Sequence, residues 1–281
     1  LMSATLGASA RVHLATGGRD EVPSLEAAIA TPYPLVTHVD AARQSPERTH
    51  AASSGSQKTV EPSLHPIADD PYAIAATALD AAREGARVLI IRNRVKDCRD
   101  VQDALEAAAG EDTDLLFAVH GTPAPHHSRF APDDRKALDA RIEEVFGAGK
   151  RASDRGCVVV ATQTVEQSLD IDADLLLTDL CPMDVLLQRI GRLHRHTRSR
   201  PVGYETARCH VLTPASRDLT PAITGEGKGW QGPHGLGTVY RDLRMVEAAW
   251  RVLEDGGLWE IPADNRRLVE EATHPEVLRA I

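Results

Sequence analysis

"GCVVVATQTVEQSLDIDADLLLTDL", residues 156–180, holds two short apolar runs, 157–161 and 175–177, with a polar loop between them. Each run is short, rich in Val or Leu and bounded by polar residues, which favours buried β-strands. The polar residues after the first run are therefore expected at the carboxyl end of a strand. Ligands of parallel α/β sheets bind at such ends. The stretch predicts a buried sheet with a binding site at its rim.

Outward from this stretch, apolar runs alternate with helical patterns along most of the chain. The predicted strands are 86–93, 114–121, 156–163, 173–180 and 207–214. The predicted helices are 71–85, 95–110, 133–147 and 183–195. Strands that alternate with helices in this way form βαβ units. We therefore predict the α/β class, with a parallel sheet covered by helices on both faces.

The regions on either side of this pattern differ in composition. Residues 22–70 are rich in Ala, Pro, Ser and Thr, which predicts a linker with at most a short strand at 33–40. The last part, 216–281, begins Gly-rich and continues as amphipathic helical patterns, so it predicts a linker and the start of a small helical domain. The main α/β unit is then expected at 71–215.

Bulk composition indicates a reduced, cytoplasmic globular protein. The 281 residues carry a formal net charge of -9, and 42% of them are hydrophobic. No apolar run approaches the roughly 20 residues of a membrane span, and no signal peptide is recognisable, so no membrane association is predicted. The cysteines are far apart and form no CxxC pair, which argues against a disulfide framework; they are Cys98, Cys157, Cys181 and Cys209.

Residues 185–200, VLLQRIGRLHRHTRSR, concentrate five arginines and two histidines without a carboxylate. On a helix with about 100° per residue, Gln188, Arg192 and Arg195 share one narrow face at i, i+4 and i+7. Guanidinium groups offer planar forks that match phosphate oxygens. A solvated basic face is the alternative. The polar loop that follows the nearby strand favours a phosphate and ribose site.

Three motifs resemble those of superfamily 2 helicases, in the same order. SAT at 3–5 resembles motif III, ATQTVEQSLDID at 161–172 resembles motif V, and QRIGRLHR at 188–195 resembles motif VI. Longer segments resemble, more specifically, the CRISPR-associated superfamily 2 helicase–nuclease of type I systems. These segments are VLIIRNRVKD at 88–97, HHSRFAPDDR at 126–135 and IPADNRRLVEEATHPE at 261–276.

The resemblance implies a domain order and an interlobe contact. Residues 1–21 would end the first RecA-like lobe, 71–215 would form the second RecA-like lobe, and 216–281 would lead into the helical C-terminal domain. Ser3 and Thr5, in the motif III segment, would couple the nucleotide state of the first lobe to the second.

The resemblance also implies a nucleotide-facing group. Arg192 and Arg195 would be arginine fingers that reach the γ-phosphate of ATP held on the other lobe, where such groups stabilise the transferring phosphoryl group. Gln188 would position the γ-phosphate or the attacking water. Asp170 would contact the ribose, with capping of a helix or turn as its alternative role.

Seven further residues would face a single-stranded DNA track, where contacts go mostly to phosphates. They are Arg92, Asn93, His127, Ser128, Arg129, Thr162 and Gln163. Two of them have other readings: Arg129 could pair with Asp133 or Asp134, and Arg92 could lie on the solvent side.

Several parts of a complete motor are missing from the sequence. It contains no GxxxxGK(S/T) loop, no DExH box before SAT and no His-Asp nuclease cluster. In the family these parts precede motif III, so we expect a fragment whose missing first lobe holds ATP and Mg²⁺. No metal site is predicted in the chain, because the pairs His126/His127 and His194/His196 lack a third ligand nearby.

The predicted function is that of the C-terminal helicase lobe of an ATP-dependent single-stranded DNA translocase in CRISPR interference. It would be recruited by a CRISPR RNA-guided surveillance complex and work with the missing N-terminal nuclease domain. The isolated chain is expected to be inactive. Two alternatives remain: a general DExH-type nucleic-acid helicase lobe, or a non-catalytic nucleic-acid or partner-binding remnant of a truncated gene.

Overall fold

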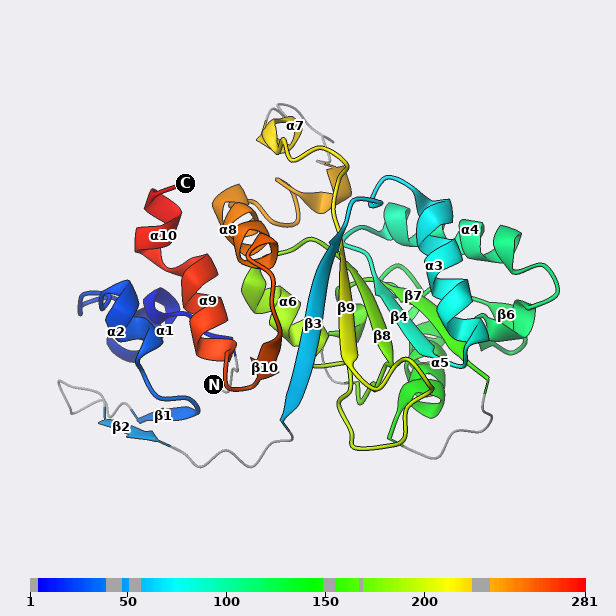
Figure 1. The fold of residues 1–281 in the computed structure, drawn as a ribbon, viewed down its shortest axis with the longest axis horizontal. Helices are drawn as coiled ribbons and strands as arrows, with labels where there is room; N and C mark the ends of the chain where they lie inside the picture. Colours follow the sequence, from blue (N-terminus) through cyan, green and yellow to red (C-terminus); the bar gives the residue numbers. More distant parts are fainter. Residues whose placement is uncertain (1–4, 39–46, 51–56, 149–154, 167–168, 224–232) are drawn as a thin grey trace.

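The computed structural model describes residues 5–38, 47–50, 57–148, 155–166, 169–223 and 233–281 (Figure 1). Its centre is a six-stranded sheet with the order β10-β3-β9-β8-β4-β7. The five parallel strands are β3 (Lys58–His65), β4 (Arg87–Ile91), β7 (Cys157–Ala161), β8 (Leu175–Asp179) and β9 (Ala207–Leu212). At one edge, β10 (Trp259–Ile261) pairs antiparallel with β3.

The central strands are apolar on both sides because both faces of the sheet are covered. Successive side chains of a strand point to opposite faces. Val88 and Ile90 of β4 pack into one hydrophobic cluster, and Leu89 and Ile91 pack into the other. All four side chains are fully buried. This two-sided burial explains the continuous apolar runs in the sequence and confirms the predicted α/β class.

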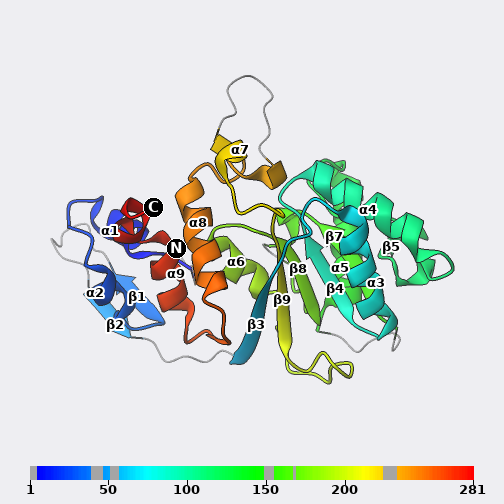
Figure 2. The ribbon, with the colours of Figure 1, turned by 45° about the horizontal axis from the view of Figure 1, so that its top comes forward.

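Helices supply the two covering layers. One cluster includes side chains of α3 (Pro71–Arg83) and α4 (Val95–Ala109), and α3 lies in front of β4 in Figure 2. The other cluster includes side chains of α5 (Pro132–Phe146) and α6 (Met183–Ile190). Asp70 caps α3, since its carboxylate accepts the backbone N–H groups of Tyr72 and Ala73.

The C-terminal part packs against the edge of the sheet. After the short α7 (Thr220–Ile223) come α8 (Leu243–Glu254), α9 (Asn265–Thr273) and α10 (Pro275–Arg279). Helix α8 contacts β3, α6 and α9, and α9 contacts α6 (Figure 1). Because β10 joins the sheet itself, this part is built onto the α/β unit.

The N-terminal helices lie against the C-terminal ones (Figure 1). They are α1 (Ala8–Thr16) and α2 (Leu25–Ile29), followed by the small hairpin of β1 (Leu35–His38) and β2 (Glu47–His50). The buried carboxylate of Glu270 on α9 accepts the backbone N–H of Ala8 at 3.1 Å and the guanidinium of Arg11 at 3.0 Å.

Two expectations differ from the structure. The interval 22–70, expected as a linker, contains the short strand anticipated at 33–40 but also α2 and the central strand β3. The strand predicted at 114–121 is reduced to a 3-10 turn, Thr113–Leu115, and the two-residue strand β5 (Ala118–Val119), which pairs with β6 (Thr122–Pro123). The segment makes one bridge beside β7 and then turns at His120 and Gly121, which both have positive φ. In the described ranges, no helix combines the length and apolarity needed to cross a bilayer.

Candidate functional site

Helix α6 ends before the two candidate arginine fingers, so the three residues predicted on one helical face do not share a helix. Gln188 lies in the last turn of α6, whereas Arg192 and Arg195 lie in the turn and loop that follow. The chain leaves the helical path where Leu193 forms a β-bridge with Ala173, just before β8. The prediction of a common helical face is wrong.

Two of the five arginines in 185–200 serve the packing of the segment itself. Arg198 contacts Asp172 at 2.6 Å and Asp174 at 2.8 Å. Arg200 contacts the same two carboxylates at 2.9 and 3.0 Å. Burial alone would raise the pKa of Asp172, but the hydrogen bonds from Arg200 and Arg198 outweigh burial and lower it. Buried carboxylates need such partners, so this part of the basic cluster is structural.

Asp170 lies beside Arg195. Arg195 Nε is 2.7 Å from the Asp170 carboxylate, and His196 Nε2 contacts the same oxygen at 2.8 Å. The side chains of Arg195 and Asp170 are 41% and 49% exposed. Asp170 lies before β8 in the chain, and Arg195 follows Leu193, which forms a bridge with Ala173 at the amino end of β8. This group therefore lies away from the carboxyl ends of the strands, where the sequence placed it.

Arg192 is half-buried and only partly satisfied. Its Nη2 donates to the carbonyl oxygen of Glu166 at 2.6 Å. Its Nε is buried without a hydrogen-bond partner among the residues that the structure describes. Burial, followed by the charge of Arg195, lowers the pKa of Arg192. A desolvated guanidinium with a spare donor is suited to an anionic ligand oxygen.

Gln188 connects the motif VI helix to the N-terminal segment. Its Nε2 donates to the hydroxyl oxygen of Thr5 at 3.4 Å, although 183 positions separate the two residues. Thr5 is 7% exposed. Ser3, the other residue expected to couple the lobes, lies outside the described residues.

Arg92 does not face a groove. Its Nε is 2.8 Å from the Asp179 carboxylate, with side chains 2% and 0% exposed, and its Nη2 donates to the carbonyl oxygen of Ala68 at 3.0 Å. Asp179 ends the neighbouring strand β8, where a buried carboxylate needs a cation. This contact contradicts the predicted DNA-facing position of Arg92 and also the solvent-facing alternative.

Asn93 belongs to a buried network centred on Arg189. The Asn93 carboxamide donates to the carbonyl oxygen of His234 at 2.9 Å and accepts from Arg189 at 2.9 Å. Arg189 also contacts the Glu166 carboxylate at 2.8 Å and the hydroxyl of Tyr240 at 2.9 Å. Arg189 is fully buried and Asn93 is 3% exposed. The network therefore contradicts a direct DNA contact by Asn93.

The two motif V residues expected on the DNA track lie at the carboxyl end of β7. Thr162 is buried, and its backbone N–H donates to the carbonyl oxygen of His126 at 2.9 Å. Gln163 is half-buried, and its Nε2 donates to the carbonyl oxygen of Asn93 at 2.8 Å. Gln163 thus lies between the ends of β7 and β4, and Thr162 presents little surface.

Of the three residues in the loop before α5 that were predicted to contact DNA, one is buried and two are exposed. His127 is buried and stacks on Phe130 with ring centroids 4.5 Å apart. Ser128 and Arg129 are exposed. Within the described ranges, Arg129 pairs with neither of the two aspartates that follow it, so its alternative role is not observed. Ser128 and Arg129 are the accessible polar groups of this loop.

Two residues with clear roles were missed by sequence reasoning. His126 is buried between the hydroxyl of Thr164 and the carboxylate of Asp139, each at 2.7 Å, and burial lowers its pKa. Its position after a short strand gave no signal beyond a possible packing role. Lys58 reaches the carbonyl oxygen of Ile190 at 2.7 Å, and it lies in the interval expected as a linker.

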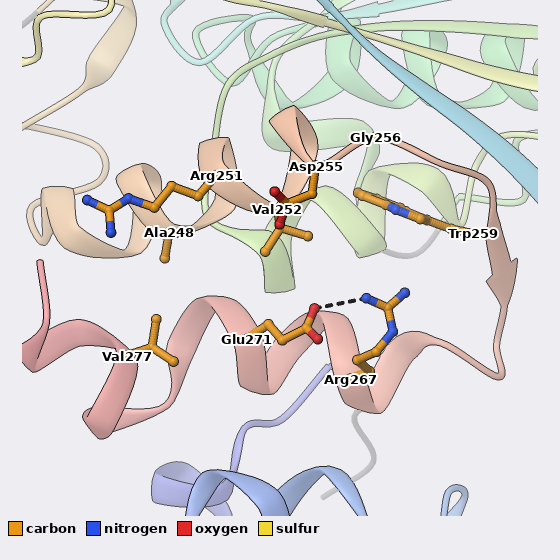
Figure 3. Close-up of a pocket in the computed structure, with 9 residues that line it drawn as sticks. All are labelled: Ala248, Arg251, Val252, Asp255, Gly256, Trp259, Arg267, Glu271 and Val277. Carbon is orange, nitrogen blue, oxygen red and sulfur yellow. Dashed lines mark hydrogen bonds and ion pairs between the residues drawn. The ribbon is translucent and has the colours of Figure 1, made fainter.

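A separate pocket of about 270 Å³ opens between α8 and α9 (Figure 3). Arg251, Asp255, Arg267 and Glu271 line it with balanced charge, and Arg267 pairs with Glu271 at 2.9 Å. It contains none of the predicted site residues. Nor do the described ranges contain a group of three His, Cys, Asp or Glu side chains that could hold a metal ion.

Known proteins match the chain in sequence and in fold. Residues 84–198 match the family model described as "CRISPR-associated nuclease/helicase Cas3, C-terminal". A CRISPR-associated endonuclease/helicase Cas3 of Thermus thermophilus is 37% identical over 179 residues, which cover 61% of this chain and 17% of that protein. The crystal structure of T. fusca Cas3 with ATP has a TM-score of 0.72 and 26% identity, covering 98% of this chain and 31% of the other.

A chain of a CRISPR RNA-guided surveillance complex, described as pre-nicking, also matches with a TM-score of 0.67 and 26% identity, covering 98% of this chain and 34% of that chain. The chain thus spans about a third or less of the length of these relatives. Its sheet and covering helices match the RecA-like lobe of Cas3, which confirms the predicted fold. In sequence over residues 84–198 and in fold over 98% of its length, this chain matches the C-terminal region of the CRISPR-associated Cas3 nuclease/helicases.

Proposed function

We propose that this chain is the second helicase lobe of an ATP-driven single-stranded DNA translocase that acts in cytoplasmic CRISPR interference. The first lobe and a nuclease domain would complete the same machine. The observation that carries the proposal is the placement of Gln188 against Thr5, with Arg192 and Arg195 in the turn and loop that follow the same helix. In this arrangement the motif VI region meets the segment expected from the first lobe.

The two arginines suit a role on the γ-phosphate. Bound ATP supplies the phosphoryl group and the free energy of its transfer. Arg192 offers a buried Nε that has no hydrogen-bond partner among the described residues. The backbone N–H of Arg195 is fixed by Asp172, but its side chain makes an exposed pair with Asp170. Such pairs contribute about 0–1 kcal/mol, so the guanidinium can exchange that carboxylate for a phosphate at little cost. Arginine fingers contribute about 10³–10⁵ to the rate of phosphoryl transfer.

The DNA-facing surface would lie at the other end of the sheet. Gln163, Ser128 and Arg129 follow or flank the carboxyl end of β7, whereas Asp170 precedes β8. The motif V segment 161–172 begins at the first group and reaches the second. A change of nucleotide state at Asp170 and Arg195 would therefore reach the DNA-facing residues through this segment. This route explains why one motif carries both kinds of residue.

The remaining partners follow from the relatives. A surveillance complex guided by CRISPR RNA would recruit the complete protein, since a chain of such a complex shares this fold. Mg²⁺ would be held with the nucleotide phosphates by the first lobe. The isolated chain has no Walker A sequence, so we expect no ATP hydrolysis from it above background.

The test uses the complete two-lobe protein. Arg195→Ala and Arg192→Ala should each lower the rate of DNA-stimulated ATP hydrolysis by about 10² or more, with nearly unchanged affinity for single-stranded DNA. Arg208→Ala is the matched control, because Arg208 is 44% exposed and also pairs with a carboxylate, that of Glu61. It should leave turnover normal.

Two outcomes would contradict the proposal. Normal ATP turnover in both finger variants, combined with lost DNA binding, would make the cluster a nucleic-acid patch. Stimulation of the wild-type ATPase by RNA and not by single-stranded DNA would favour a general helicase.

A further inference from the structure

Lys58 joins strand β3 to the turn that carries the candidate arginine fingers. Its Nζ donates to the carbonyl oxygen of Ile190 at 2.7 Å and also to the carbonyl oxygen of Leu193. Ile190 is the last residue of α6, and Leu193 directly follows Arg192. One ammonium group therefore holds both ends of the turn 190–193.

The backbone that carries Lys58 is fixed on the sheet. Lys58 is opposite Ile261 of β10, and two residues later Val60 is opposite Ala207 of β9. Strand β3 is thus paired on both sides near this point. A side chain that projects from a rigid element can set the position of what it binds more precisely than one on a loop.

The acceptor at Ile190, the last residue of α6, favours a cation. The last carbonyl oxygens of a helix lack partners within it, and the helix dipole places negative charge there. Burial above all, helped by the charges of Arg200 and Arg195 and opposed by Asp172, lowers the pKa of Lys58 to about 8. A pKa of about 8 leaves most of this amine protonated at neutral pH, so its hydrogen bonds are charge-assisted.

We infer that Lys58 is a positioning residue that sets the place of Arg192 and Arg195 relative to the sheet. The inference rests on the proposed function, in which these arginines act on ATP. Without the ammonium group, the bridge between Leu193 and Ala173 remains to hold the turn against the sheet. A displacement of about 1 Å in a catalytic group can cost about 10²-fold in rate.

Three variants of the complete two-lobe protein test this role. Lys58→Met removes the ammonium group and keeps an apolar stem. We expect it to lower kcat for DNA-stimulated ATP hydrolysis by about 10- to 100-fold, with KM for ATP and Kd for single-stranded DNA changed less than about twofold. Lys58→Arg keeps a cationic donor and should restore most of the rate. Lys136→Met, at an exposed position on α5, should have no effect.

A double-mutant cycle separates positioning from general damage. In a background that lacks both arginines (Arg192→Ala with Arg195→Ala), Lys58→Met should reduce the residual kcat by less than about threefold, since both of the groups that it positions are already gone. A full additional 10-fold loss would overturn the inference, and so would equal losses of kcat and DNA binding. If Lys58→Met does not fold, Lys58→Gln takes its place under the same criteria.

The outcomes also separate this inference from the proposed function. If Arg192→Ala and Arg195→Ala leave ATP turnover normal, the proposed function fails. If those variants abolish turnover and Lys58→Met does not lower it, only the positioning role of Lys58 fails.

Discussion

The side chain of Gln188 donates a hydrogen bond to the hydroxyl of Thr5 at 3.4 Å, which joins the motif VI helix to the segment that resembles motif III. Both side chains are largely shielded from solvent. In the proposed motor this contact lies between the two lobes, so it is a direct place for one lobe to sense the other.

Replacement of Thr5 tests that contact. Thr5→Val keeps the shape of the side chain and removes the hydroxyl, and a neutral hydrogen bond contributes about 1 kcal/mol. We expect the ratio of DNA-stimulated to basal ATP turnover in the complete protein to fall about fivefold, with basal turnover unchanged. Thr77→Val on α3 is the control, since its hydroxyl donates to the carbonyl oxygen of Ala73 in its own helix. An unchanged ratio would remove Thr5 from the coupling.

Two arginines only six positions apart should differ sharply in their effect on stability. Arg189→Leu leaves the Glu166 carboxylate and the Asn93 carboxamide without their buried partner, so the free energy of unfolding should fall by about 3–5 kcal/mol. Arg195→Ala breaks an exposed pair and should cost less than about 1 kcal/mol. Urea titrations of the purified chain, followed by circular dichroism, measure both. Equal losses would contradict the distinction between structural and accessible arginines.

Replacement of Arg129 should affect DNA binding and replacement of Arg92 should affect stability, because Arg129 is exposed and Arg92 is buried. Arg129→Ala in the complete protein should weaken single-stranded DNA binding equally for unrelated sequences. It should make the log–log salt dependence shallower by about 0.7, the value for one lost phosphate contact. Arg92→Ala should instead lower the free energy of unfolding by about 3–5 kcal/mol, since it leaves Asp179 buried and unpaired. Arg83→Ala, an exposed arginine on α3, is the control for DNA binding.

Two half-buried histidines, His194 and His210, should make the fold sensitive to mild acid. Burial, followed by the charge of Arg200, lowers the pKa of His194 from 6.5 to about 4, and burial, followed by His65 and Arg208, lowers the pKa of His210 to about 4. Between these values the unfolded chain binds protons that the folded chain refuses, so stability is lost as pH falls from 6.5 toward 4.

The check is the free energy of unfolding measured against pH in urea. His194→Asn and His210→Asn should each flatten the decline between pH 6.5 and 4. Asn tolerates the positive φ of position 194, which is 44°. The wild type and the two variants share all their carboxylates, so the carboxylate contribution cancels when the free energy of unfolding of a variant is subtracted from that of the wild type. Parallel curves for the variants and the wild type would contradict the assigned pKa shifts.

The sheet was predictable where its strands are buried on both faces. The runs in β4, β7 and β8 are continuous and apolar, so no tertiary information was needed to recognise them. Strand β3 was missed although Val60 and Leu64 alternate with polar residues. Pro62 and the surrounding polar composition hid the pattern, and pairing with β9 decides the strand. That pairing joins segments about 150 residues apart in sequence.

The site was predictable as a set of motifs and not as a geometry. The bridge between Ala173 and Leu193 fixes how the segment 185–200 aligns with Asp170, Asp172 and Asp174. That alignment decides which arginines of the segment are paired with a buried carboxylate and which stay accessible. The alternating carboxylates were a signal that two of the arginines were already partnered. The burial of Arg92 likewise depends on Asp179, which lies on a neighbouring strand.

The hydrogen bonds from the start of α1 to Glu270 have a mechanical consequence. The carboxylate on α9 holds both the backbone of Ala8 and the guanidinium of Arg11, so the start of α1 is tied to α9. A pull on the chain ahead of α1 would load α9 directly and pass through its packing into α6, without first stretching the sheet. A load on the start of α1 would thus reach α6, the helix that precedes the turn and loop with Arg192 and Arg195, by way of α9.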